Sequence, residues 1–358
     1  MLRRGELGRS TRGMMLTGLR GVGKTVLLNE LATRAEEHQR IVAQLEVRPD
    51  GSQALLTNLA RLIMHGLRKQ QGPKLSELAK RALSSIKAFS LTVDPSGTLS
   101  ASIDLDAVGS GDLEIDVTAL AVDVSRAAMQ FGTGVAVFID ELQGLDKPTM
   151  ASLAAAAHTA GQRNVPFVVV VGAGLPNLPG KLSEAKSYAE RLFDYRPLGR
   201  LEAGTAGEAL AGPATASGVE WTLDALAEVV NAADGYPYFL QEFGAASWNM
   251  ALGPDQITMH DAVNGIRHGL AILDGGFFRS RWDRATATER LYLRAMAEDE
   301  GKDTRTPDVG ARMGRSASNL GPIRAGLIGK GLVYAPKYGM VAFTVSGMAN
   351  FIQRQAEH

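Results

Sequence analysis

The sequence has no cysteine, no net charge and no long hydrophobic run. Without cysteine, disulfides and thiolate metal sites are excluded, which fits a reducing compartment. The 38 Lys and Arg residues balance 38 Asp and Glu residues, so any nucleic-acid surface must be local. The longest apolar run, around Phe167–Val171, is too short to span a bilayer, and the Arg-rich N-terminus lacks the apolar region of a signal peptide. We therefore expect a cytoplasmic protein that does not enter a membrane.

A phosphate-binding loop lies close to the N-terminus. The stretch fits the pattern G-x-x-x-x-G-K-[ST] and consists of Gly18, Leu19, Arg20, Gly21, Val22, Gly23, Lys24 and Thr25. Gly18 and Gly23 allow the backbone to turn so that successive N–H groups point at an anion. Lys24 would reach the β- and γ-phosphates, and the Thr25 hydroxyl would bind Mg²⁺. A helical pattern that includes Val26 follows, so the phosphates are expected at a helix N-terminus, with Val26 beside the nucleotide.

A pair of carboxylates follows the apolar stretch Val135–Ile139. The continuous apolar run predicts a strand that is buried on both faces, as in a parallel sheet. Asp140 and Glu141 come at its carboxyl end, where open α/β sheets bind ligands. Asp140 would hold Mg²⁺, directly or through water, and Glu141 would orient or deprotonate the attacking water. The alternative is a buried strand that ends at an ordinary acidic turn.

Strands and helices alternate over the first 200 residues. Apolar runs predict strands at 14–17, 40–47, 135–141 and 166–171. Periodic apolar residues predict helices at 25–38, 53–71, 74–88, 116–131, 147–162 and 183–193. This alternation predicts the α/β class, with a doubly wound parallel sheet and the P-loop NTPase fold. We assign residues 1–200 to a P-loop ATPase domain.

Residues 89–115 interrupt that alternation and are predicted to be an insertion. Residues 89–106 alternate apolar and polar residues around a Pro-Ser-Gly turn, which indicates a hairpin. Between Lys87 and Arg126 there are seven acidic residues and no basic one. A solvated acidic face is expected, and binding of a partner is the alternative.

The pattern is helical from residue 201 onward. Residues 204–212, 222–234, 237–251 and 258–272 predict an all-α lid over 201–275, where no further strand is expected. A Gly275-Gly276 pair marks the joint to the next domain.

Residues 276–358 predict a winged-helix domain. Helices are expected at 286–297, 306–313 and 316–330, and strands at 331–334 and 340–345, with Thr286 and Glu289 capping the first helix. From Lys302 to Arg354 there are eight basic and two acidic residues, an excess that suits phosphates. The third helix is expected to expose side chains suited to phosphates and base edges, which are Arg315, Ser316, Ser318, Asn319 and Arg324. Duplex DNA is the expected partner, and a protein partner is the alternative.

The phosphate loop, the acidic pair, the lid and the winged helix together resemble the AAA+ and STAND superfamily of ATPases, in particular origin-recognition-like and archaeal-type members. The stretches that carry the resemblance are Gly18–Thr25, Asp140–Gln143, Val171–Gly174 and Asp234–Leu240. Pro237 is similar to the proline of the Gly-x-Pro motif in STAND lids, which lies against the bound nucleotide. The resemblance implies ATP and Mg²⁺ as cofactors, slow hydrolysis, and a switch between ADP and ATP conformations.

Two departures from the AAA+ pattern favour a STAND-like interpretation and leave the rate of hydrolysis open. AAA+ proteins usually place Asn, Ser or Thr at the end of the strand after the acidic pair, whereas residues 172–174 here are Gly-Ala-Gly, and Asn177 follows. The helix after Pro237 also lacks the sensor arginine of AAA+ lids. In addition, only 17 residues precede the phosphate loop. We therefore expect either loose binding of the adenine or a true start upstream.

Arg191 is the expected arginine finger. In oligomeric AAA+ ATPases an arginine near the helix after the third core strand reaches the γ-phosphate of the neighbouring subunit. Arg191 lies at about that place, which implies a homo-oligomer. Arg196 and Arg200 are rival candidates, and a local pair with Glu190 or Glu184 would leave Arg191 a structural residue.

These features predict an ATP-binding and ATP-hydrolysing conformational switch that binds DNA through a winged helix. Glu141, Lys24 and Arg191 would carry the hydrolysis. The alternative is a nucleotide-gated protein-interaction module with little hydrolysis. A metabolic phosphotransferase is disfavoured, because it would leave the lid and the winged helix unexplained.

Overall fold

A computed structural model describes residues 12–48, 51–70, 81–82, 84–85, 110, 112–163, 169–251 and 255–355. The chain divides into two compact units: the first comprises Met1–Thr17 and Lys24–Pro197, and the second Gly18–Gly23 and Leu198–His358. The predicted hairpin at 89–106 and most of the predicted helix at 74–88 lie outside the described residues.

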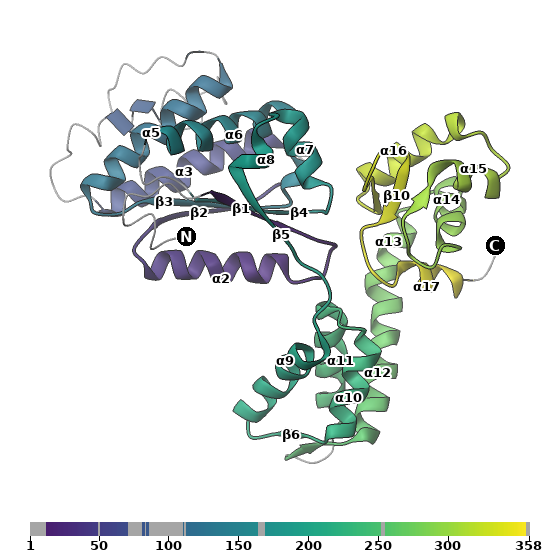
Figure 1. Cartoon of the computed structure of the whole chain (residues 1–358). Coiled ribbons are helices and arrows are strands. Elements are labelled where there is room, and N and C mark those ends of the chain that lie inside the picture. Colours follow the sequence, from purple (N-terminus) through teal and green to yellow (C-terminus); the bar gives the residue numbers. More distant parts are fainter. Residues whose placement is uncertain are drawn as a thin grey trace. The chain divides into compact units, whose positions relative to one another are not determined.

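The first unit is built on a parallel sheet of five strands in the order β2-β3-β4-β1-β5 (Figure 1). The strands are β1 (Gly13–Thr17), β2 (Ile41–Glu46), β3 (Val135–Asp140), β4 (Val169–Gly174) and β5 (Phe193–Pro197). Every neighbouring pair runs parallel. All six residues of β3 are buried, which explains its continuous apolar sequence. The predicted α/β class and parallel sheet are confirmed.

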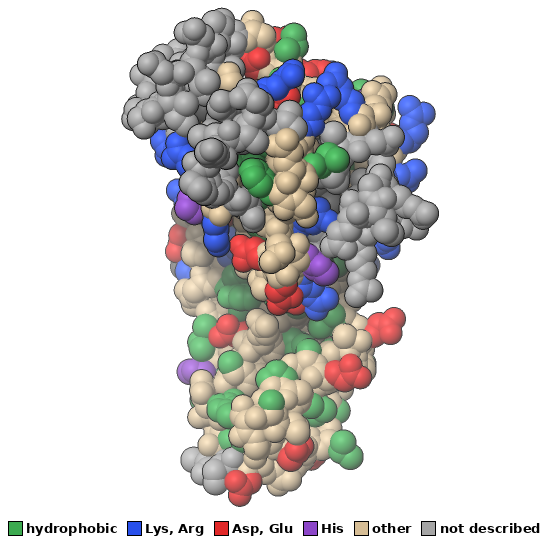
Figure 2. All heavy atoms as spheres, turned by 90° about the vertical axis from the view of Figure 1, so that its left-hand side faces the viewer, with side chains coloured by type: hydrophobic (Ala, Val, Ile, Leu, Met, Phe, Trp, Pro, Cys, Tyr) green, Lys and Arg blue, Asp and Glu red, His purple; other side chains and the backbone are tan. Residues whose placement is uncertain are grey.

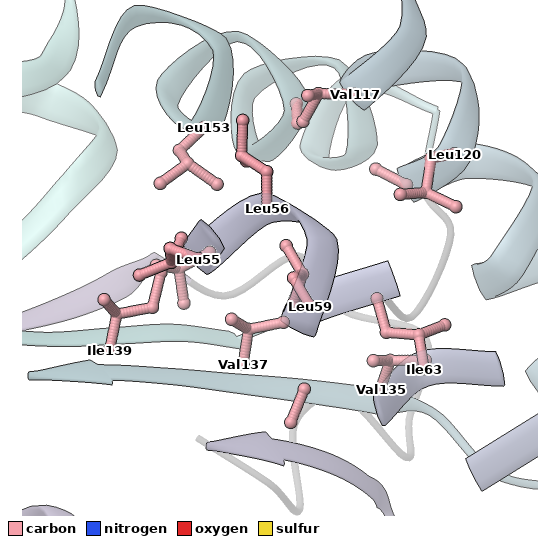
Figure 3. Close-up of a cluster of buried hydrophobic side chains, with 14 of the residues drawn as sticks. Leu55, Leu56, Leu59, Ile63, Val117, Leu120, Val135, Val137, Ile139 and Leu153 are labelled. Atoms are coloured by element: carbon pink, nitrogen blue, oxygen red, sulfur yellow. The ribbon is translucent and has the colours of Figure 1, made fainter. Parts of the chain in front are cut away.

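Helices cover both faces of this sheet (Figure 1). One face carries α2 (Lys24–Glu37). The other carries α3 (Ser52–Gln70), α5 (Leu113–Gln130), α6 (Lys147–Gln162), α7 (Leu178–Ala185) and α8 (Ala189–Leu192). Figure 3 shows how α3 fills the core: Leu59 and Ile63 lie towards β3, whereas Leu56 points to α5 and α6. The burial of this apolar face, rather than helix propensity, holds α3 in place.

The strand β5 was not predicted, and the single helix expected at 183–193 is wrong. Instead α7 and α8 are two short helices, and the strand begins at Phe193. Its residues pass from the buried Phe193 to the exposed Pro197, as an edge strand allows, so it lacks a continuous apolar run. A Cβ on Gly13 would lie 2.7 Å from the ring of Phe193, so β1 and β5 approach closely at this glycine. The last residues of the predicted insertion also belong elsewhere: α5 starts at Leu113, and Asp112 caps it.

The second unit begins with the helices α9 (Ala203–Ala216), α10 (Leu223–Ala233), α11 (Pro237–Met250) and α12 (Met259–Ile272). The expectation of no strand is wrong, because β6 (Glu220–Trp221) and β7 (Gln256–Ile257) pair in parallel. Strands of two residues are too short to leave a periodic pattern in the sequence. The expected joint at Gly275-Gly276 lies within a π-helical turn, η2 (Leu273–Phe278), that continues into α13 (Arg279–Asp283).

The rest of the second unit combines helices with a three-stranded sheet in the order β8-β10-β9. Its elements are α14 (Ala287–Ala297), β8 (Thr304–Arg305), α15 (Thr306–Arg312), η3 (Ala317–Leu320), α16 (Gly321–Gly329), β9 (Val333–Tyr334), β10 (Met340–Phe343) and α17 (Met348–Gln353). The predicted capping box of Thr286 and Glu289 is confirmed. The helix expected at 316–330 is instead η3 followed by α16, and β8 and α17 were not predicted. Among the described residues, no helix is both long and apolar enough to cross a membrane.

Candidate nucleotide site

The phosphate loop occupies the turn between β1, which ends at Thr17, and α2, which begins at Lys24, as predicted. Gly21 and Gly23 both have φ of +87°, a conformation that residues with a Cβ rarely adopt. Gly18 is required for a different physical reason from Gly21 and Gly23. A Cβ there would lie 2.4 Å from the carbonyl oxygen of Leu198, so this glycine is required for close packing rather than for a left-handed turn.

The first unit brings the predicted magnesium ligands together. Thr25 lies in the first turn of α2, and its hydroxyl donates to Oδ2 of Asp140 at 2.5 Å. The other carboxylate oxygen of Asp140 accepts the backbone N–H of Glu141 at 2.8 Å. Lys24, the first residue of α2, is 6% exposed. A lysine, a hydroxyl and a carboxylate thus meet where the parallel strands end.

These residues fit a magnesium ion. A hydroxyl and a carboxylate oxygen are hard ligands, and Mg²⁺ is usually held by one or two carboxylates together with substrate phosphates and water. Among the described residues there is no group of three or more His, Asp or Glu side chains that could enclose a metal. Thr25 and Asp140 therefore suit an ion that arrives with its phosphates.

Glu141 is held in an unusual backbone conformation. Its φ of +54° lies in the left-handed region, which costs a residue with a side chain about 1–3 kcal/mol. The turn that follows, η1 (Leu142–Gly144), brings Gln143 back towards it, and Nε2 of Gln143 donates to Oε2 of Glu141 at 2.6 Å. Gln143 was not predicted to be a site residue, because its contact with Glu141 depends on a left-handed backbone that the sequence does not reveal.

The second unit joins the phosphate loop to the start of α11. Pro237 is the first residue of that helix, and the backbone N–H of Tyr238 donates to the Gly21 carbonyl at 3.1 Å. A Cβ on Gly21 would lie 3.1 Å from atoms of both Tyr236 and Tyr238. Burial raises the pKa of Tyr236 to about 12, so this phenol stays neutral. Gly21 and the start of α11 at Pro237, which were both predicted to bind the nucleotide, are therefore close together.

The phosphate loop also contacts the segment after β10. The backbone N–H of Arg20 donates to the Thr344 carbonyl at 2.9 Å, and Arg20 forms a parallel β-bridge with Val345. A cavity of 380 Å³ lies beside these contacts, and its wall includes Leu19, Val22, Leu198, Tyr236, Val345 and Met348. The sequence did not predict that the end of the chain would reach this loop.

The remaining predicted site residues are solvent-exposed. Val26 is 66% exposed on α2. Arg191 is exposed on α8, and none of the described residues forms an ion pair with it, so the alternative of a local pair with Glu190 or Glu184 is not observed. By contrast, Arg196 pairs with Asp194 at 2.7 Å, and Arg200 pairs with Asp234.

Two parts of the chain match family models. Residues 1–171 match an AAA ATPase domain, and residues 275–352 match a domain of unknown function, DUF8462. No curated protein matches the sequence.

Among solved structures, the Walker-type ATPase PABY2304 of Pyrococcus abyssi is similar over 95% of this chain and 90% of its own, with a TM-score of 0.57 and 15% identity. Thermotoga maritima RuvB, a Holliday junction branch migration motor, covers 99% of this chain and 91% of its own, with a TM-score of 0.46 and 17% identity. Aeropyrum pernix Orc1 in complex with DNA covers 98% and 88%, with a TM-score of 0.44 and 14% identity.

At these identities a structural likeness concerns the fold alone, and a TM-score below 0.5 adds no argument. The match over residues 1–171, the parallel sheet and the phosphate loop agree with one another. Residues 1–171 therefore match an AAA ATPase domain, and the first unit has the α/β fold of a P-loop NTPase.

Proposed function

We propose that this protein binds and hydrolyses MgATP and uses the nucleotide to control a DNA-binding C-terminal domain. The observation that carries the proposal is the hydrogen bond of 2.5 Å between Thr25 and Asp140, next to the buried Lys24. A buried lysine at a helix N-terminus suits phosphates, and the two oxygen ligands suit their magnesium ion. When bound, Mg²⁺ would neutralise charge on the phosphate oxygens.

The residues of the chain would divide the remaining work. Lys24 would pair with the phosphates, and the loop N–H groups around Gly21 and Gly23 would surround them. Glu141 would orient the attacking water or accept its proton.

The contact between Arg20 and Thr344 supports the control of the C-terminal domain. Phosphates that bind to the loop would draw its N–H groups inward, and Arg20 uses its own N–H to hold the Thr344 carbonyl. A change in the conformation of the phosphate loop would therefore strain or break its hydrogen bond to Thr344, the residue that directly follows β10. Nucleotide binding and the C-terminal domain would then share one equilibrium, as a switch requires.

Only some of the eight basic residues between Lys302 and Arg354 are available for the proposed DNA surface. Five of the eight already have partners in the structure: Arg312 with Asp299, Arg324 with the Met340 carbonyl, Lys330 with Glu289, Arg354 with Asp274 and Lys302 with Glu300. The expectation that Arg324 is exposed is therefore wrong. The other three basic residues are Arg305, Arg315 and Lys337. None of them forms an ion pair with an acidic residue in the described part of the chain.

Two of these residues come from neighbouring segments, Arg305 from β8 and Lys337 from the turn before β10. Arg305 pairs with Met340 across β8 and β10, and the N–H of Thr306 donates to the Gly339 carbonyl at 2.8 Å, next to Lys337. Tyr338 at the tip of this turn is fully exposed. An exposed aromatic ring in a turn that also carries Lys337 suits nucleic acid, because positive charges pair with phosphates and the ring can contact sugars or bases.

The helical region α9–α12 offers no such surface. Residues 201–272 contain nine acidic residues and one basic residue, Arg267. The lower part of Figure 2 shows this region, with hydrophobic side chains among acidic ones. Contact with DNA is therefore proposed for the C-terminal domain alone.

The triple variant Arg305→Ala, Arg315→Ala, Lys337→Ala is expected to weaken duplex DNA binding and to flatten its salt dependence. Each neutralised phosphate contributes about −0.9 to the slope of log K against log[salt]. The loss of three contacts should therefore make this negative slope less steep by about 2.7. Fluorescence anisotropy over a salt series measures both quantities. Arg267→Ala serves as the matched control, because it removes an exposed arginine from the acidic region.

A protein partner is the second candidate, and α16 provides the observation in its favour. The exposed residues of this helix are Gly321, Pro322, Ala325, Ile328 and Gly329, none of which is charged. Leu291 of α14 is also 55% exposed. If the wild type binds no duplex DNA at low salt, the DNA proposal fails and this apolar helix becomes the leading candidate surface.

Arg191 is proposed to act on the nucleotide of a neighbouring copy, since it is exposed and no ion pair with it occurs among the described residues. ATPase activity per subunit should then rise with protein concentration, and Arg191→Ala should abolish this rise without changing ATP affinity, because the residue supplies charge only in trans. Arg196→Ala is the control, because Arg196 already pairs with Asp194. Constant activity per subunit, from a protein that sediments as a monomer with ATP, would refute the role.

A further inference from the structure

Gln143 lies at the centre of a small hydrogen-bond network at the carboxyl end of the sheet. Its side-chain Nε2 donates to Glu141 at 2.6 Å, and its Oε1 accepts the backbone N–H of Leu175 at 3.0 Å. Its backbone carbonyl accepts a hydrogen bond from Nζ of Lys181 at 2.7 Å. Gln143 thus connects the residue after β3 with the residue after β4.

The Leu175 contact fixes which way the amide of Gln143 points. A glutamine side chain has one acceptor oxygen and one donor nitrogen, and a backbone N–H can bond only to the oxygen. With Oε1 on Leu175, the N–H₂ group must face the carboxylate of Glu141, where a donor is required. The two bonds therefore support each other.

The end of β4 is shaped to admit this side chain. Gly174 is the last residue of the strand, and a Cβ there would lie 2.6 Å from Oε1 of Gln143. Any larger residue at this position would push the amide away from Leu175. The glycine that replaces the expected polar residue at the strand end therefore makes room for a polar group from η1.

Lys181 of α7 holds the backbone of the same turn. It is half-buried, and burial lowers the pKa of its ammonium group below the ordinary value, although Glu184 partly offsets this effect. Its hydrogen bond to the Gln143 carbonyl holds the backbone of the turn. The position of Gln143 is thus set at both its backbone and its amide.

We propose that Gln143 is a positioning residue that holds the Glu141 carboxylate in the orientation needed for hydrolysis. The inference rests on the proposed ATPase function and on the proposed role of Glu141 in it. Glu141 has a left-handed backbone, and its carboxylate can rotate about three side-chain bonds. The amide of Gln143 restricts that rotation from a fixed point, which provides the preorganisation that catalysis requires.

Steady-state kinetics on two variants separate this role from a structural one. Gln143→Met keeps the length of the side chain but removes both of its hydrogen bonds. Gln143→Glu keeps an oxygen for Leu175 but loses the N–H that faces Glu141. Both variants should lower kcat by about 10- to 100-fold, the usual effect of losing a residue that orients a functional group, while the Kd for MgATP stays unchanged.

Asn177→Ala is the control, because Asn177 is another amide near the same end of the sheet, and among the described residues its side chain does not bond to Glu141. It should leave kcat unchanged. Gln143→Met added to Glu141→Gln should cause no further loss, because a residue that acts only through Glu141 has nothing left to position.

The outcomes distinguish the possible failures. A wild type without ATPase activity, or Glu141→Gln with normal turnover, overturns the proposed function and this inference with it. If Glu141→Gln is inactive but Gln143→Glu turns over normally, the bond to Leu175 is what matters and the positioning role is wrong. A further loss of kcat in the double variant, or a weaker Kd with kcat intact, also overturns it.

Discussion

Glu141→Gln should lower ATP turnover by about 10²–10⁴-fold, the usual contribution of a general base, and should leave MgATP binding unchanged. The substitution keeps the shape of the side chain and its place beside Gln143. It removes the negative charge that would attract the proton of the attacking water. A coupled assay of phosphate release measures turnover, and calorimetry measures binding.

Glu46→Gln is the matched control for this prediction. Glu46 is an exposed carboxylate at the end of β2 and pairs in register with Asp140 on the neighbouring strand. If turnover depended only on the total negative charge at this end of the sheet, both variants would lower it. Unchanged turnover in Glu141→Gln would mean that Glu141 does not take part in hydrolysis.

Lys24→Ala should weaken MgATP binding by about 2–5 kcal/mol, the cost of truncating one member of a buried, hydrogen-bonded charge pair. This corresponds to about 30- to 5000-fold in Kd. Lys24 is buried at the first position of α2, so no exposed cation can replace it. The stabilisation by MgATP in a thermal melt should shrink accordingly, because that stabilisation depends on ligand concentration relative to Kd.

The control is Lys147→Ala, since Lys147 is also the first residue of a helix, α6, but is exposed. It should keep the full thermal shift with MgATP. If Lys24→Ala retains the wild-type shift, its ammonium group does not bind the phosphates.

The sequence predicted the sheet and the phosphate loop because both follow from local patterns. The strand β3 is buried on both faces and therefore reads as a continuous apolar run. The loop requires glycine at defined positions, and Gly21 and Gly23 have the left-handed conformation that explains this requirement. The capping box of Thr286 was likewise visible as two residues at fixed spacing.

The missed features depend on contacts between distant residues. The strand β5 is an edge strand, and its partial exposure removes the apolar signal. The amide of Gln143 is oriented by Leu175, which is 32 residues away, and no short motif records that pairing. The exposure of Arg324 was misjudged for the same reason, since its guanidinium reaches a carbonyl in β10.

The most direct test of the account is a calorimetric titration of ATP into the wild type with and without Mg²⁺, with Lys24→Ala as the reference. We expect saturable binding at one site per chain, weaker binding when Mg²⁺ is withheld because Thr25 and Asp140 then lack their ion, and a large loss in Lys24→Ala. An absence of binding heat in the wild type at several temperatures, or equal affinity in wild type and Lys24→Ala, would contradict the assignment of this loop as the nucleotide site.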